Sequence, residues 1–131
     1  MLEVSKNAEA AAEQMLSDAY ELVLSGWCQG MSAQDEMGRA IEPSSAFARS
    51  WSAAGALERV WRRADEDELS LEAFERANLA FAAVVKESPQ RWNDAPGRTR
   101  PQVLEALLDA SSLLDSGARG QNSSVRWVSP L

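Results

Sequence analysis

Apolar residues recur at helical spacing in four separate segments of this chain, and this repetition restricts the fold more than any other feature. The segments are residues 7–24, 43–64, 70–86 and 100–115. Short connections between such segments favour antiparallel neighbours. We therefore predict an all-α protein, or a mostly α one with a minor β-hairpin, built as a compact four-helix bundle with one irregular arm at residues 29–43.

The chain is expected to form one domain, since its 131 residues lie within the usual size of a single domain. We assign residues 1–117 to a single helical domain, with a frayed start over residues 1–7 and Gly117 as the cap of the last helix. Residues 118–131 are polar and lack a helical period, which predicts a flexible C-terminal tail. Alternatively, residues 125–128 pair as an edge strand or dock as a plug.

Three places in the first half of the chain need a special backbone. Gly26 is predicted to end the first helix in the left-handed conformation. Gly55 lies inside the second helix, where glycine costs roughly 1 kcal/mol relative to alanine, and close approach of another backbone is the simplest compensation. Residues 35–39 have turn chemistry, and the segments beside them, 29–33 and 39–42, form either a small β-hairpin or an ordered loop.

The stretch from residue 92 to residue 99 is the most tightly specified part of the sequence. Pro96 and Gly97 suit the two central positions of a type II turn, because proline presets φ and glycine accepts the positive φ that follows. Thr99 is predicted to cap the next helix, with Gln102 completing a capping box. This backbone holds four side chains at one small corner: Trp92, Asn93, Asp94 and Arg98.

Charge is distributed unevenly along the chain, whose formal charge is −7. Residues 1–90 contain 8 basic and 16 acidic side chains, whereas residues 91–131 contain 5 basic and 4 acidic ones. An acidic body opposes binding to nucleic acid and suits a protein partner with a basic surface. No apolar run is long enough to span a membrane, and a single cysteine cannot form an internal disulfide. We therefore expect a cytoplasmic location and no membrane partner.

The sequence offers few groups for catalysis or metal binding. It contains no histidine, which excludes Ser-His-Asp and Cys-His nucleophile arrangements and His-ligated metal sites. Cys28 is either a nucleophile or, as we expect, a small buried hydrophobic residue. Asp35, Glu36, Glu42 and the acidic run 65–68 are candidate ligands for a hard cation, but they lack the calcium-loop pattern. We predict no catalytic set, no metal site and no cofactor, and we lean against an enzyme.

Seven residues are candidates for a binding site: Trp27, Gln29, Arg39, Trp92, Asn93, Asp94 and Arg98. Tryptophan and arginine dominate binding hot spots, and Asp94 could serve with Arg98 as a charge clamp or general base. Structural roles are the alternative: the loop tryptophans would close the ends of the core, and Asn93 with Asp94 would satisfy loop amides. Trp51 and Trp61 share a helical stripe and are expected in the core.

Four blocks of the sequence carry a resemblance. They are Gly26-Trp27-Cys28-Gln29-Gly30, Asp35-x-x-Gly38-Arg39, Trp51-x-x-x-Gly55-Ala56-Leu57 and Trp92-Asn93-Asp94-Ala95-Pro96-Gly97-Arg98-Thr99. Over about residues 10–115 the chain resembles a family of small bacterial and phage-borne proteins of unknown function. Members often carry a cysteine one residue after the position of Trp51, where this chain has Ser52. That departure argues further against an enzymatic function. The resemblance implies no catalytic residues, but it does imply a phage or mobile-element context.

Three hypotheses for function follow. The leading one is a non-enzymatic interaction protein, a phage-encoded inhibitor of a host defence complex that acts through an acidic surface and the Trp/Arg loops. The first alternative is a small-ligand-binding domain or minor enzyme with a pocket at residues 92–99. The second alternative is a structural or assembly component of a phage.

Overall fold

The computed structural model describes residues 2–64 and 67–122. Over these ranges the protein is mostly helical, with four substantial helices packed together, one short helix and a two-stranded antiparallel sheet. The predicted fold class is therefore confirmed. The elements are α1 (Leu2–Ser25), β1 (Ala33–Gln34), β2 (Ser50–Trp51), α2 (Ala53–Arg63), α3 (Glu68–Val85), α4 (Pro89–Asn93) and α5 (Arg100–Asn122).

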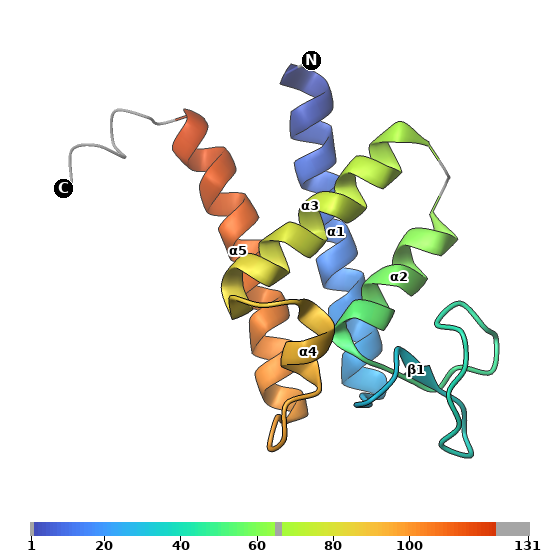
Figure 1. Ribbon diagram of the computed structural model, residues 1–131. Coiled ribbons are helices and arrows are strands. Elements are labelled where there is room, and N and C mark those ends of the chain that lie inside the picture. Colours follow the sequence, from blue (N-terminus) through green and yellow to red (C-terminus); the bar gives the residue numbers. More distant parts are fainter. Residues whose placement is uncertain (1, 65–66, 123–131) are drawn as a thin grey trace.

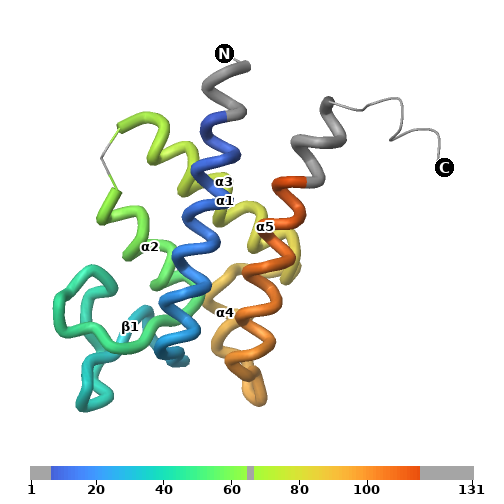
Figure 2. Tube along the Cα trace, turned by 180° about the vertical axis from the view of Figure 1, so that it is seen from behind, coloured from blue at the N-terminus to red at the C-terminus, as the bar shows by residue number. Residues whose placement is uncertain are grey.

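Helix α1 is the central element of the bundle. It packs against α5 on one side and α2 on the other, while α3 crosses the same helix on the face turned toward the viewer in Figure 1. Seen from behind, α1 lies in front, between α2 and α5 (Figure 2). Its largest fully buried side chains are Leu16 and Val23, which meet Leu57, Phe81 and Leu107 from the three surrounding helices. One helix therefore organises the core.

Most of the other buried apolar residues are alanines, and these allow the helices to approach closely. Fully buried examples are Ala12 and Ala19 on α1, Ala56 on α2 and Ala77 on α3. Larger rings fill the ends of the core. Trp61 is half-buried and stacks on Phe74 with ring centroids 4.4 Å apart, so its predicted place at the core is confirmed.

The second helix begins ten residues later than predicted. Residues 43–52 form irregular turns and β2, and α2 starts only at Ala53. Ser52 is its N-cap and accepts a hydrogen bond from the Gly55 amide at 3.0 Å. Trp51 is buried as expected, but from a strand rather than from a helical stripe, and Phe47 is 70% exposed. The apolar spacing of residues 47–51 was therefore misleading.

Local hydrogen bonds explain why helix does not extend backward through residues 43–48. The Ser45 hydroxyl accepts from the Phe47 amide at 3.0 Å, a serine turn that competes with helical bonding. The Trp51 indole donates to the Pro43 carbonyl at 3.0 Å, and Arg59 donates to the same oxygen at 2.8 Å. These side chains hold the segment folded back on itself and alongside α2.

Helix ends also differ from the predictions at both termini of the chain. Helix α1 begins at Leu2, within the segment that was predicted as a frayed start. No proline or glycine interrupts residues 2–25. Helix α5 passes through Gly117 and ends at Asn122, so the glycine is not a cap. The predictions for residues 123–131, including the strand or plug at 125–128, lie outside the described residues.

The irregular arm predicted at residues 29–43 is present, but its strand β1 pairs with a strand that lies outside the arm. Strand β1 pairs antiparallel with β2, with Ala33 opposite Trp51 and Gln34 opposite Ser50. The expected turn at residues 35–39 is confirmed: the Asp35 amide donates to the Arg39 carbonyl at 2.9 Å, and Gly38 has a φ of 82°. The expected hairpin is reduced to a bridge between Gln34 and Ala40 and a hydrogen bond from the Ile41 amide to the Ala33 carbonyl at 3.1 Å.

Two glycines permit backbones to touch near the start of α2. A Cβ on Gly55 would collide with the Ser32 carbonyl oxygen, which confirms the predicted close approach of another backbone. A Cβ on Gly26 would collide with the Arg49 carbonyl oxygen, and Gly26 does not have a positive φ. The left-handed cap predicted at Gly26 is therefore wrong, and the residue is needed for space instead.

We expect Gly55→Ala to destabilise the protein by about 2–3 kcal/mol, the effect of forcing an extra methyl into a packed site. In an uncrowded helix the same change would stabilise by about 1 kcal/mol, so the sign of the effect is diagnostic. Urea unfolding followed by circular dichroism measures it. The neighbouring change Ala54→Gly serves as a control, with an expected loss of about 1 kcal/mol from helix propensity alone. An increase in stability for Gly55→Ala would contradict the close approach.

Candidate functional site

The corner at residues 92–99 has the backbone that its sequence predicts. The Arg98 amide donates to the Ala95 carbonyl at 3.0 Å across Pro96 and Gly97, and Gly97 has a φ of 83°. This is the expected turn with positive φ at its third residue. The capping box is also present. The Thr99 amide donates to the Gln102 side chain at 3.0 Å, and the Gln102 amide donates to the Thr99 hydroxyl at 3.4 Å.

Asn93 occupies the centre of a buried polar junction. It is the last residue of α4 and is 0% exposed. Its Oδ1 accepts from the Trp27 indole at 2.8 Å and from the Ala53 amide at 3.0 Å. Its Nδ2 donates to the Cys28 carbonyl at 3.1 Å and to Asp94 Oδ1 at 3.0 Å. One amide thus joins α4, the loop after α1 and the start of α2.

Gln29 and Asp94 complete the same junction. Gln29 Nε2 donates to the carbonyl oxygens of Asn93 at 2.9 Å and Ala95 at 3.0 Å. Asp94 Oδ1 accepts from the Gly30 amide at 2.9 Å. These are side-chain-to-backbone bonds of the kind that the structural interpretation of Asn93 and Asp94 required.

Burial by itself would raise the pKa of the Asp94 carboxyl. Hydrogen bonds from the Gly30 amide and from the Asn93 and Gln90 side chains outweigh that effect, and the pKa lies below its ordinary value. A general base poised for catalysis near neutral pH needs a raised pKa. The junction therefore keeps Asp94 ionised as an acceptor of structural hydrogen bonds.

Two further members of the junction were missed from the sequence. Gln90 Nε2 donates to both oxygens of Asp94, at 3.0 and 3.1 Å, and its Oε1 accepts from the Ser52 hydroxyl at 2.9 Å. Ser52 is 0% exposed. A serine directly before an alanine-rich helical run is an N-cap signal that could have been recognised. Nothing in the sequence pointed to Gln90.

Trp92 and Arg98 form a separate pair beside the junction. The Arg98 guanidinium lies 3.9 Å from the Trp92 ring centroid, and its Nε donates to the Trp92 carbonyl at 2.9 Å. The Trp92 ring also contacts Phe81 in an edge-to-face arrangement, with centroids 5.8 Å apart. A small pocket of about 260 Å³ lies next to this pair, with Glu105 and Asp109 among its lining residues.

Arg39 lies apart from the other six candidates. It sits on the irregular arm, where its Nε is 3.2 Å from Asp35 Oδ2, and its side chain is 76% exposed. The structure therefore brings Trp27, Gln29, Asn93 and Asp94 together through direct hydrogen bonds. It places Trp92 and Arg98 beside them and leaves Arg39 elsewhere. Trp92 and Arg98 line one pocket, whereas Arg39 lines a different one.

Cys28 is a buried thiol, as the sequence suggested. It is 5% exposed, and its Sγ lies 3.8 Å from the Met31 carbonyl. Burial raises the pKa of the thiol, the nearby Asp94 charge raises it further, and a hydrogen bond with Ser50 partly opposes both. A reactive cysteine needs the opposite shift, because the thiolate is the nucleophile.

The described residues offer neither a group of metal ligands nor a membrane-spanning helix. No group of three or more His, Cys, Asp or Glu side chains in the described ranges is arranged to hold a metal ion. Asp35 accepts from the Arg39 and Met37 amides, and these bonds lower the pKa of its carboxyl. None of the described helices has the length and apolar content that a membrane crossing requires.

We expect Asp94→Asn to lower the free energy of unfolding at pH 7 by about 1–2 kcal/mol, because an amide cannot accept all the bonds that the carboxylate accepts. The lowered pKa of Asp94 makes this stabilisation present above its unfolded pKa near 4 and lost as pH falls through the folded pKa. The difference in unfolding free energy between wild type and variant should therefore become smaller below about pH 4. Thermal unfolding across pH measures it.

The exposed carboxylate Asp109 provides the control for that experiment, since Asp109→Asn should change stability by less than about 0.5 kcal/mol. An Asp94→Asn protein with an unchanged melting temperature would show that the carboxylate is dispensable for the fold and available to a ligand.

A second prediction concerns Cys28. Its low exposure and raised pKa should make alkylation by iodoacetamide at pH 8 slower in the folded protein than in urea by on the order of 100-fold, because reaction needs local opening. Mass spectrometry follows the labelling. A Cys28→Ala protein carrying Ser17→Cys, at an exposed position of α1, should label rapidly in both states. Equally rapid labelling of native Cys28 would contradict the burial.

Comparison with known proteins identifies the family of the chain. Residues 7–113 match a family of unknown function (DUF6197). No curated protein and no solved structure matches the chain.

Proposed function

We propose that this chain, which belongs to the family of unknown function DUF6197, is a non-enzymatic interaction protein that acts by binding another protein. The partner has a basic surface. The narrower form of the proposal is an inhibitor, encoded by a phage or mobile element, that blocks a host defence complex by occupying one of its subunits.

The main support is that the side chains best suited to catalysis or ligand binding already make contacts that stabilise the fold. Asn93 makes four hydrogen bonds within the protein, and Asp94 is held ionised by three neighbours. The Cys28 thiol has a raised pKa and is buried. The chain contains no histidine that could replace them. What remains for function is the molecular surface.

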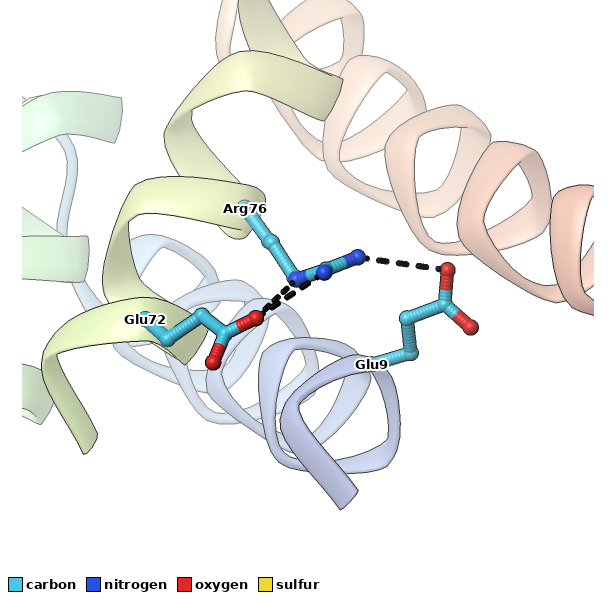
Figure 3. A network of polar contacts seen from close by, with 3 residues as sticks. All are labelled: Glu9, Glu72 and Arg76. Atoms are coloured by element: carbon cyan, nitrogen blue, oxygen red, sulfur yellow. Dashed lines mark hydrogen bonds and ion pairs between the residues drawn. The ribbon is translucent and has the colours of Figure 1, made fainter. Parts of the chain in front are cut away.

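The charge of α1 indicates which kind of partner that surface suits. Residues 7–25 contain four acidic and no basic side chains. One of the four, Glu9, is neutralised within the fold by Arg76 of α3, which lies 3.4 Å from it and also 2.9 Å from Glu72 (Figure 3). Asp18 and Glu21 are exposed. A negative field of this kind attracts basic partners and speeds their association.

The alternative of a small-ligand pocket at residues 92–99 has weaker support. The pocket beside Trp92 and Arg98 holds about 260 Å³, below the volume range of roughly 300–1,000 Å³ that is usual for ligand sites. The Arg98 guanidinium is stacked on the indole and bonded to a backbone carbonyl. That arrangement leaves little of the arginine for a ligand.

Affinity capture from a lysate of the native host tests the proposed function. The tagged full chain should recover a protein with a basic surface at low salt, and the yield should fall at least several-fold between about 50 and 300 mM salt, because exposed charges are screened. An unrelated acidic protein of similar size is the control bait. Recovery of the same proteins by both baits, or of none above background at low salt, would contradict the proposal. The identity of the captured protein tests the defence-inhibitor form.

A further inference from the structure

A groove lies between α1 and α2, away from the polar junction. It has a volume of about 590 Å³. The two helices meet near the start of α2, where Ala53, Ala56 and Leu57 are buried. From there α2 leans away from α1 toward its own C-terminal end, as both views show (Figures 1 and 2). The groove opens where the helices diverge.

We infer that this groove binds an amphipathic helix of the partner protein, with basic side chains on the flank of that helix that faces α1. The inference rests on the proposed function and specifies the surface and the kind of segment that it uses.

The floor of the groove is apolar and adaptable. From α1 it receives Ala11, Met15 and Leu22, and from α2 and its C-cap it receives Val60 and Ala64. Met15 is buried at the bottom, whereas the other four are half-buried. Methionine fills irregular gaps and adjusts to different neighbours, which suits a surface that must receive side chains from outside.

The walls favour a helix over an extended peptide. Both walls are helices whose main-chain groups bond within the helix, so the groove offers no strand edge. An extended segment would lose water from its amides without gaining partners, whereas a helix satisfies its own. Along α1 the groove runs from Ala11 to Leu22, about 16 Å at 1.5 Å per residue. That length matches three turns of helix.

The two rims carry opposite charges. Asp18 and Glu21 line the α1 rim, and Arg59 and Arg63 line the α2 rim. No ion pair joins the two rims among the described side chains. Both carboxylates are exposed, so an incoming lysine or arginine can reach them. The α1 rim is therefore complementary to a basic flank.

One of the two arginines on the α2 rim is already engaged within the fold. Arg59 already donates to the carbonyl oxygens of Pro43 and Ser45, at 2.8 and 3.0 Å, and lies over the Trp51 ring. Arg63 is exposed at the end of α2. The acidic rim therefore dominates the preference of the groove.

Two synthetic peptides test the inference. Each is a 15-residue amphipathic helix with leucines on one face, and its flanks carry either lysines or glutamates. At about 20 mM salt, where surface charges are least screened, we expect the lysine peptide to bind the full chain at least tenfold more tightly than the glutamate peptide. Fluorescence anisotropy measures the affinity, and amide chemical shifts should change in residues 11–22 and 59–64.

Charge reversal on the rim provides a matched control. The double variant Asp18→Lys with Glu21→Lys should reverse the preference between the two peptides. The double variant Glu105→Lys with Asp109→Lys makes the same change at two exposed positions of α5, outside the groove, and should keep the wild-type preference. No binding of either peptide, shift changes confined to other residues, or equal effects of the two double variants would overturn the inference.

Two other occupants would also overturn it. If a second copy of the chain fills the groove, light scattering should show a dimer that the Asp18→Lys, Glu21→Lys variant dissociates. If residues 123–131 fill it, removing them should tighten peptide binding at least fivefold, whereas we expect a change of less than twofold.

The lysate experiment separates this inference from the proposed function. Capture that is unchanged by the Asp18→Lys, Glu21→Lys variant would leave the proposed function standing and reject the groove. Peptide binding without any captured protein would support the groove and reject the proposed function.

Discussion

The four hydrogen bonds of the buried Asn93 amide hold the lower end of the protein together. The loop after α1, the start of α2 and the end of α4 each present main-chain groups to the same place, and buried groups of this kind need partners. Asn93 supplies an acceptor for the Ala53 amide and a donor for the Cys28 carbonyl. Gln29 and Asp94 do the same for their neighbours. Side chains that look reactive in the sequence thus replace the regular secondary structure that these loops lack.

Small residues at the helix contacts determine the shape of the surface. Gly55 brings the start of α2 against Ser32, and buried alanines bring α1 close to its neighbours. Because α2 is fixed tightly at its beginning and diverges afterwards, its later turns separate from α1 (Figure 1). The groove between the two helices follows from that divergence.

Local chemistry predicted some parts of the structure well. Pro96 and Gly97 specify their turn by φ preferences alone, and Thr99 with Gln102 specify a cap within four residues. The start of α2 was not predicted, because the apolar spacing of Phe47 and Trp51 imitates a helix. The partners of Asn93 were beyond prediction as well, since Trp27 lies 66 residues away and its proximity depends on the packing of three helices. The groove follows from helix divergence, which no local pattern encodes.

That sequence distance of 66 residues between Trp27 and Asn93 also bears on the order in which the protein assembles. Each helix can form from contacts within its own segment. The junction, like the packing of α1 on α5, closes a long loop at an entropic penalty, and its hydrogen bonds also need α1, α2 and α4 already in place. We therefore expect the junction to form after the rate-limiting step of folding. Contacts made that late slow unfolding more than they speed folding. The polar junction then mainly determines the lifetime of the folded state, and the helical core mainly determines the folding rate.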